Sequence, residues 1–293
     1  MSLARRVSGL LCCLLLVACG ESGETRLAVQ SGTAAPRLVT LSPHLAELVY
    51  AIGAGDQLVG VTAYTDYPPE TLSLPVIGDA FNLDLERLLL LAPDMLLAWD
   101  QGTPQHVIDQ LREHGYQVEV ITTTSIGDIG EALRRIGSLT AREVAAEQAA
   151  NEFESAIDGL AAEMARQPAI RVFYQVDARP LYTVSGAHYV SEVLALCGGE
   201  NIFAEVGGLA PPVSVEAVLE RNPEAMLAST DAGPQAFDQW QRWPALAANR
   251  YGNHFLIPAN EIARATPRLL VAAEGVCDAL RQARQNREAY RDD

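Results

Sequence analysis

The sequence predicts an α/β protein made of two Rossmann-like lobes, each with a parallel sheet. Strand-like apolar runs alternate with helical periods along most of the 293 residues, and strands separated by helices form parallel sheets. One passage occurs twice, at residues 84–98 and 214–228. Between the copies, residues 141–167 contain no Pro and are rich in Ala, Glu and Gln, which predicts one long connecting helix.

The beginning of the chain has the order of a secretory signal. Two arginines precede an apolar run that ends in Leu-Val-Ala-Cys, and this ending resembles a bacterial lipobox in which Cys19 is lipidated. The run is too short to serve as a permanent membrane span. We therefore expect a lipoprotein signal peptide over residues 1–19 and a flexible tether over residues 20–36. An ordinary signal peptide cleaved nearby is the alternative.

The first lobe is expected over residues 37–140. A strand at residues 37–41 leads into a helix that Ser42 caps, Pro43 begins and Gly53 ends. The elements that follow are a strand at 58–61, the first copy of the repeat, a helix ending at residue 114, a strand at 118–121 and a helix beginning near residue 125.

Each copy of the repeat reads as a short helix with an acidic first turn, stopped by Pro and followed by an apolar strand. Glu86 and Glu216 occupy the same place in the two copies. In an α/β lobe, helices begin at the end where strands finish, and ligands bind at that end. One Glu per lobe therefore marks the rim that carries the ligand. The alternative is that both carboxylates only stabilise a helix dipole.

The second lobe is expected over residues 168–285, from a strand at 171–175 to a last helix near Pro267, with residues 286–293 as a tail. Cys197 and Cys277 are the two cysteines that follow Cys19. An exported protein meets an oxidising compartment, so the pair predicts a disulfide. Two buried free thiols are the alternative.

The composition excludes several classes of partner. The chain has 37 acidic and 21 basic residues and a formal net charge of −16, and the charge becomes more negative once the signal is removed with its arginines. Nucleic acid and anionic lipid are poor partners for such a surface. No segment after Cys19 is long and apolar enough to cross a bilayer, so membrane attachment is expected through the lipid anchor alone.

No sequence motif indicates an enzyme or a metal centre. Gly-x-Ser-x-Gly and phosphate-loop patterns are absent, and Ser185 and His188 lie close in sequence without a third member of a triad. The histidines are scattered, with no pair at ligand spacing: His44, His106, His114, His188 and His254. His44 is the exception among them, because it sits in a first helical turn at the cleft end, where a ligand would bind. It also fits a solvated residue at the start of a helix. We expect no catalytic residue, no metal and no cofactor.

Six short motifs spread over residues 36–283 form a pattern. They are Leu41-Ser42-Pro43 with Glu47, Tyr64-Thr65-Asp66-Tyr67-Pro68-Pro69, Leu85-Glu86-Arg87, Pro93-Asp94 with Ala98-Trp99, Gly198-Gly199-Glu200-Asn201-Ile202-Phe203 and Arg264-Ala265-Thr266-Pro267-Arg268. Together they resemble the periplasmic cobalamin-binding proteins that feed an ABC importer. The general pattern is shared with haem and siderophore binders, and the Tyr-x-Asp-Tyr-Pro-Pro loop and the Ala-Trp strand end indicate cobalamin. The resemblance implies two lobes bridged by one long helix, with the ligand between the lobes.

The resemblance also implies a set of ligand-binding residues. Tyr64 and Trp99 match aromatic walls of the family's cleft, and Arg264 matches an arginine on the rim of the second lobe. Two positions depart from the family: Asn260 stands where the family has a ligand-facing Asp, and the Ala-Phe pair ending at Phe81 stands where it has a Trp. These departures leave room for a variant corrinoid.

By the same resemblance, Glu86 and Glu216 match the carboxylates that meet arginines on the two halves of the membrane transporter. The expected partner is therefore the permease dimer of an ABC importer.

The chemistry of a corrin fits the same residues. A corrin is a broad, mostly apolar disc fringed by amides, so its site should offer flat aromatic faces and a few polar groups. The aromatic residues near turns at the lobe edges are Tyr64, Tyr67, Trp99 and Tyr189. Each of these side chains also fits ordinary packing. We expect a monomeric, periplasmic, lipid-anchored protein that binds cobalamin. The alternative is a haem or ferric-siderophore binder, in which Tyr64 or His44 is an axial ligand or the Arg264 region is an anion site.

Overall fold

The computed structural model describes residues 35–79 and 81–292. The predicted signal peptide, the predicted lipidation site Cys19 and nearly all of the predicted tether lie outside these residues, as does Ala80. Among the described residues, no helix combines the length and the apolar character that a membrane span requires.

The first lobe is built on a parallel sheet with the strand order β2-β1-β3-β4. Its strands are β1 (Leu38–Thr40), β2 (Leu58–Gly60), β3 (Met95–Trp99) and β4 (Val118–Ile121). Its helices are α1 (Pro43–Ala51), α2 (Leu85–Leu91), α3 (Gln105–Glu113) and α4 (Ile126–Thr140), with short 3-10 helices at Gly55–Gln57 and Pro69–Ser73. The two middle strands are the most buried, since Leu38, Leu96 and Leu97 have no exposed surface.

The second lobe has a parallel sheet with the order β10-β9-β5-β8. Its strands are β5 (Ile170–Gln175), β8 (Gly199–Asn201), β9 (Ala225–Ser229) and β10 (His254–Ile257), with a small antiparallel pair of β6 (Asp177–Ala178) and β7 (Leu181–Tyr182). Its helices are α6 (Tyr189–Leu196), α7 (Val215–Arg221), α8 (Ala247–Tyr251), α9 (Ala259–Ala263) and α10 (Leu269–Asp292), with 3-10 helices at Thr230–Ala232 and Asp238–Arg242.

The two sheets share one topology. Replacing β2, β1, β3 and β4 by β8, β5, β9 and β10 converts the strand order of the first lobe into that of the second. The predicted fold class, two α/β lobes with parallel sheets, is therefore confirmed.

The repeated passage forms the same structure in both lobes. Asp84 caps α2 by accepting from the Arg87 amide at 2.9 Å, and Ser214 caps α7 by accepting from the Ala217 amide at 3.1 Å. Both helices end in the left-handed conformation, at Ala92 (φ 42) and at Asn222. A Pro follows each of these turns and cannot continue a helix. The chain then enters β3 or β9, which are inner strands of their sheets.

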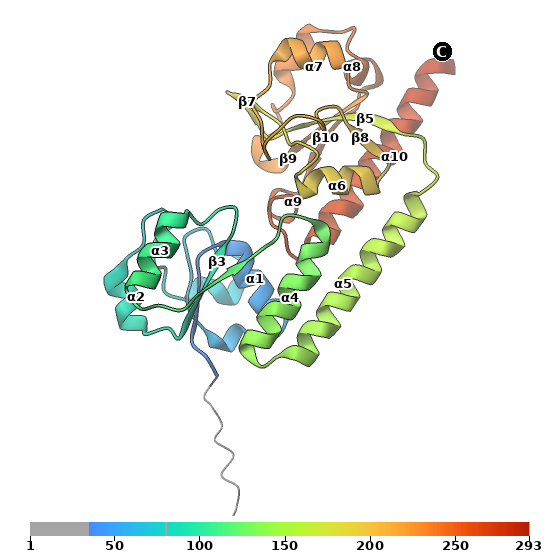
Figure 1. Cartoon of the computed structure of the whole chain (residues 1–293). Helices are drawn as coiled ribbons and strands as arrows, with labels where there is room; N and C mark the ends of the chain where they lie inside the picture. Colours follow the sequence, from blue (N-terminus) through green and yellow to red (C-terminus); the bar gives the residue numbers. More distant parts are fainter. Residues whose placement is uncertain (1–34, 80, 293) are drawn as a thin grey trace, which may run out of the picture. The chain divides into compact units, whose positions relative to one another are not determined.

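The connection between the lobes is a pair of packed helices (Figure 1). Helix α5 (Glu143–Met164) leads from the first lobe to the second, and α4 packs along it. The left-handed turn at Ala141 (φ 54) separates the two helices, so the connecting helix begins slightly later than predicted. A Cβ atom at Gly137 of α4 would lie only 2.3 Å from that of Ala146, so a side chain there would collide with α5.

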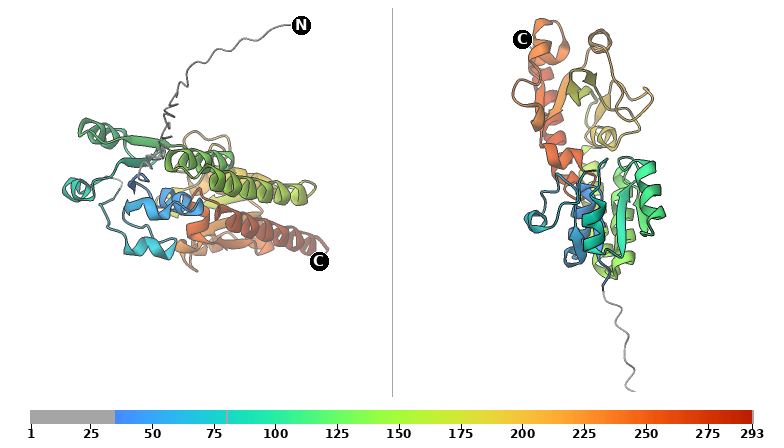
Figure 2. Two further views of the ribbon diagram at one scale, coloured as in Figure 1. Left: turned by 90° about the horizontal axis from the view of Figure 1, so that it is seen from below. Right: turned by 90° about the vertical axis from the view of Figure 1, so that its left-hand side faces the viewer.

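The last helix is longer than predicted. Residues 286–293 were expected as a tail, but α10 continues to Asp292. Side chains of its final turns have partners in the second lobe: Asn286 donates to Asn253 at 2.9 Å, and Arg287 pairs with Glu224 at 3.1 Å. Helix α10 also lies beside α5 (Figure 1 and Figure 2). Arg281 of α10 pairs with Glu163 of α5 at 3.0 Å. These contacts explain why the helix does not end at residue 285.

Cys197 and Cys277 form a disulfide, with Cα atoms 4.7 Å apart. The bond joins the end of α6 to the middle of α10, and both cysteines are buried. It therefore ties the last helix to the core of the second lobe.

We predict that removing the disulfide with the double change Cys197→Ala and Cys277→Ala lowers the free energy of unfolding by about 2–4 kcal/mol. The bond spans a sequence separation of 80 residues, and the open chain gains entropy in the unfolded state. Urea denaturation measures the change. A reductant should destabilise the wild type to a similar level and leave the double variant unaffected, and equal stability of wild type and variant contradicts the prediction.

Candidate functional site

Two adjoining cavities lie at the cleft end of the first lobe. The larger, of about 410 Å³, is lined by first-lobe residues: Leu41, Ser42, Pro43, Thr62, Ala63, Tyr64, Asp79, Phe81, Trp99 and Gly102. The other, of about 310 Å³, is lined by residues of both lobes: Ser42, Pro43, His44, Trp99, Thr123, Tyr189, Asn260, Ala263, Arg264 and Ala265. Ser42, Pro43 and Trp99 line both. The two linings together contain all the ligand-binding residues that the sequence analysis singled out.

Trp99 stands between the two cavities, at the end of β3. The edge of the His44 ring packs against it, with centroids 4.9 Å apart, and its backbone N–H donates to Thr103 Oγ1 at 3.0 Å. The backbone of Gly102 lies so close that a Cβ atom there would come within 2.0 Å of the indole. The orientation of the indole is therefore fixed by its neighbours. The indole Nε1 is buried and has no hydrogen-bond partner among the described residues.

Two further aromatic side chains are largely exposed beside Trp99. Tyr64 is 84% exposed and Phe81 is 70% exposed. Tyr64 adopts the left-handed conformation, with φ of 67°, which is rare and strained for a bulky residue. Phe81 lies in a turn that Asp79 holds by accepting from the amides of Phe81 and Asn82, each at 2.8 Å. Large apolar side chains gathered at the mouth of a cavity are typical of a binding surface.

His44 lies inside the protein, so its interpretation as a solvated helix-start residue is wrong. It is 5% exposed, and its ring nitrogens lie 2.7 Å from Ser42 Oγ and 3.3 Å from Thr123 Oγ1. Burial, and then the nearby charge of Arg264, lower the pKa of His44 to about 3. The imidazole is therefore neutral at physiological pH. Among residues 35–79 and 81–292, no group of His, Cys, Asp and Glu side chains has the arrangement of a metal site.

Arg264 faces groups of the first lobe. Its Nη1 donates to Glu47 at 2.7 Å and to Asp66 at 2.6 Å, and its Nη2 donates to the carbonyl of Tyr64 at 3.1 Å. Burial alone would lower the pKa of Arg264, but its bonds to Asp66 and Glu47 outweigh burial and raise it. The side chain is 12% exposed, so it lines the smaller cavity with most of its surface covered.

Glu47 is the buried centre of this contact between the lobes. Its side chain is 3% exposed, and besides Arg264 it accepts from Thr266 Oγ1 at 3.1 Å and from Arg268 at 3.2 Å. Arg268 also lies over the ring of Tyr67, 3.9 Å from its centroid. Tyr67 is therefore held against the second lobe and does not line either cavity of the site. Glu47 and Asp66 stand in the recognised motifs, but sequence reasoning gave them no role; a lone Glu within the apolar helix 43–51 was the available signal.

Asn260 and Tyr189 are the other second-lobe residues of the site. Asn260 donates to Asp66 at 3.4 Å, across the cleft. Tyr189 is buried, and its hydroxyl donates to the carbonyl of Ile262 at 3.0 Å, so it supports α9 as well as lining the smaller cavity.

Glu86 and Glu216 lie in the first turns of α2 and α7, and both are exposed. The helix caps are made by Asp84 and Ser214, so neither Glu is needed as a cap. Within the described part of the chain, neither carboxylate has a hydrogen-bond or ion-pair partner. Both are therefore available to a partner outside this chain.

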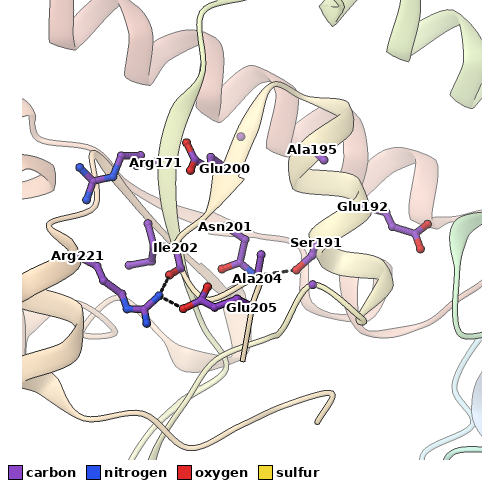
Figure 3. Close-up of a pocket in the computed structure, with 12 residues that line it drawn as sticks. Arg171, Ser191, Glu192, Ala195, Glu200, Asn201, Ile202, Ala204, Glu205 and Arg221 are labelled. Carbon is purple, nitrogen blue, oxygen red and sulfur yellow. Dashed lines mark hydrogen bonds and ion pairs between the residues drawn. The ribbon is translucent and has the colours of Figure 1, made fainter. Parts of the chain in front are cut away.

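A larger cavity, of about 660 Å³, lies within the second lobe alone, beside β8 and α6 (Figure 3). Charged side chains line part of it, including Glu192, Glu200 and the ion pair of Arg221 with Glu205. No aromatic side chain lines it, and none of the predicted ligand-binding residues belongs to it, although residues 199–202 come from one of the recognised motifs. Its size does not make it a better candidate, because it offers no flat apolar face to a ligand.

Comparison with known proteins agrees with the fold. Residues 38–261 match the family described as periplasmic binding protein. The chain belongs to this family. A vitamin B12-binding protein of Vibrio cholerae serotype O1 is 34% identical over 252 residues, covering 86% of this chain and 91% of the relative. A vitamin B12-binding protein of Pectobacterium carotovorum is 37% identical over 252 residues, covering 83% of this chain and 88% of the relative.

Two solved structures show the same fold. The periplasmic vitamin B12 binding protein BtuF of Vibrio cholerae has a TM-score of 0.78 and 34% identity, covering 86% of this chain and 98% of BtuF. The periplasmic haem-binding protein HutB of the same species has a TM-score of 0.74 and 24% identity, covering 84% of this chain and 98% of HutB. At that lower identity the likeness to HutB concerns the fold alone.

The neutral histidines predict a loss of stability in mild acid. The pKa of His44 is about 3 and that of His188 is about 4 in the folded protein, both lowered first by burial, against 6.5 for an ordinary His. As pH falls below 6.5, the unfolded chain binds protons that the folded chain does not. The stability from each neutral His is complete above pH 6.5 and is lost at up to about 1.4 kcal/mol per pH unit as pH falls toward the folded pKa.

We therefore expect the free energy of unfolding, measured with urea, to fall between pH 7.5 and pH 5.0. The variant His44→Gln should show a shallower slope, because it lacks one of the titrating groups. Identical slopes for the wild type and for His44→Gln contradict a neutral, buried His44.

Proposed function

We propose that this protein captures cobalamin, a corrinoid, in the periplasm and delivers it to the permease of an ABC importer. The observation that carries the proposal is the pair of adjoining cavities that share Trp99 and are flanked by Tyr64 and Phe81. Each cavity has the size of a part of a ligand site, since pockets for small molecules commonly measure about 300–1,000 Å³.

The lining matches the chemistry of a corrin. The faces of Tyr64, Phe81 and Trp99 suit a broad apolar disc, and aromatic faces supply most of the binding energy in such sites. The side-chain amides at the edge of a corrin need hydrogen-bond partners. Asn260, on the opposite lobe, lines the smaller cavity and offers such a group. The relatives called vitamin B12-binding proteins support the same ligand.

The ring of His44 argues against its proposed role as an axial ligand of haem. An axial ligand needs a free nitrogen lone pair, but both ring nitrogens of His44 already have hydroxyl partners, in Ser42 and Thr123. Of the two expected axial ligands, Tyr64 and His44, Tyr64 alone remains accessible, through its exposed phenol. The preference for cobalamin over haem therefore rests on the mostly apolar lining of the larger cavity and on the vitamin B12-binding relatives.

The proposal extends to the cellular setting. A lipid on Cys19 would hold the protein at a membrane, with residues 20–36 as the tether, and the protein would work as a monomer. The ligand leaves the site chemically unchanged, so the proposal includes no catalytic step and no resident cofactor. Glu86 and Glu216, exposed and without partners among the described residues, would meet basic residues on the two halves of the permease.

Titration of the mature protein with cyanocobalamin and with haemin by calorimetry tests the ligand. Cobalamin should bind and haemin should not. Binding of haemin alone makes the protein a haem binder, and binding of neither compound refutes the proposed function.

Replacing Trp99 by Ala should weaken cobalamin binding at least tenfold, about 1.4 kcal/mol, because an aromatic wall common to both cavities is lost. The matched control is Trp243→Ala, since Trp243 packs against Trp240 in the second lobe and lines neither cavity. Calorimetry gives the affinity, and thermal melting shows that both variants are folded. Unchanged affinity in a folded Trp99→Ala protein removes Trp99 from the site.

The double change Glu86→Ala and Glu216→Ala should leave cobalamin affinity within about twofold, near 0.4 kcal/mol, while uptake into proteoliposomes that contain the permease falls sharply. Charges at the rim of an interface chiefly steer and register a complex, so docking should also lose its salt dependence. A control variant changes two exposed carboxylates outside helix first turns, Glu113→Ala and Glu274→Ala. If uptake stays normal while the Glu86 and Glu216 double variant is present at the wild-type level, the docking role is wrong. Both residues are then only carboxylates that stabilise the starts of their helices.

A further inference from the structure

The segment that carries Tyr64 is unusual in how it is held. We call residues 62–69 the Tyr64 loop. Its backbone is strained at Tyr64, with φ of 67°, and the Tyr64 ring is 84% exposed. The ring therefore gains little from packing in the first lobe, and contacts of the backbone must keep the loop in this conformation. One such contact joins the Ala63 amide to the carbonyl of Gly78 at 2.7 Å.

The contacts to Tyr64 and Asp66 come from the second lobe. Arg264 Nη2 donates to the Tyr64 carbonyl at 3.1 Å, and Nη1 donates to Asp66 Oδ1 at 2.6 Å. Asn260 Nδ2 donates to the other oxygen of Asp66 at 3.4 Å. Two side chains that lie one helical turn apart in sequence thus hold the Tyr64 loop at two points, on either side of Thr65.

Arg264 is itself held in place by a buried carboxylate. Its Nη1 also donates to Glu47, whose carboxylate is 3% exposed and is bonded to Thr266 as well. A guanidinium group is planar and presents its donors in a rigid fork, so one bond to Glu47 fixes the direction of the others. The position of the loop therefore depends on the first lobe's own Glu47, acting through a residue of the second lobe.

We propose that Arg264 is a positioning residue: it acts on the ligand through Tyr64 and Asp66, by holding the Tyr64 loop in the conformation that presents the aromatic ring to the cavity. The role of the loop in ligand binding rests on the proposed function, whereas the clamping of the loop does not. A loop held before the ligand arrives loses less conformational entropy on binding, and this raises affinity. Asn260 is a second, weaker part of the same clamp, and its amide suits Asp66 where a carboxylate would repel it.

The first test needs no ligand. Chymotrypsin cleaves after Tyr, and cleavage after Tyr64 requires the loop to open, so its rate in the ligand-free mature protein reports the clamp. Arg264→Ala should be cleaved after Tyr64 at least fivefold faster than the wild type, and Asn260→Asp at least twofold faster. Arg281→Ala is the matched control, because it removes an exposed arginine that pairs with Glu163 and has no contact with the Tyr64 loop, and its rate should equal that of the wild type. An unchanged rate in a folded Arg264→Ala protein, or an equal rise in Arg281→Ala, overturns the clamp.

The second test asks how Arg264 acts on the ligand. In a double-mutant cycle with cyanocobalamin, Arg264→Ala should weaken binding at least fivefold in the wild-type background and less than about 1.5-fold when Tyr64 is already Ala. Equal losses in both backgrounds, or no loss in either, overturn the positioning role. If the wild-type protein fails to bind cobalamin, the proposed function fails, and the cleavage rates still decide whether Arg264 clamps the loop.

Discussion

A buried carboxylate, Glu47, holds the two lobes together, and the arrangement of the site depends on how its charge is compensated. A carboxylate that is 3% exposed must be paired and hydrogen-bonded, since removing one partner of a buried pair typically costs about 3–5 kcal/mol. Its partners Arg264, Thr266 and Arg268 all come from the second lobe. The lobes therefore meet through a network whose charges are mutually satisfied, and Arg264 of this network lines the smaller cavity of the site.

Much of the scaffold could be predicted because its determinants are local. The caps Asp84 and Ser214, the prolines that stop α2 and α7, and the apolar runs of β3 and β9 all lie within one short passage that the sequence repeats. Local periodicity also predicted the connecting helix. The extent of α10 could not be predicted in this way, because its last turns are held by Asn253 and Glu224, which are distant in sequence.

The residues of the site also divide into those that local sequence predicts and those that it does not. Its aromatic members could be proposed from motifs, and the structure gathers them around Trp99. The contacts of Arg264 with Tyr64 and Asp66 join residues about 200 positions apart, and no periodicity or spacing encodes such a pairing. The burial of His44 was missed for the same reason, since Thr123, which contacts its ring, comes from a different strand end.

The close approach of α4 and α5 at Gly137 has a mechanical consequence. With hydrogen as the only side chain at that position, the two helices lie against each other, and any larger residue would wedge them apart at the first-lobe end of α5. Helix α5 has 22 residues and so extends about 33 Å. A small tilt at its base is therefore multiplied along this lever arm into a larger displacement where it joins the second lobe. The absence of a methyl group at position 137 thus helps to set the direction in which α5 runs toward the second lobe.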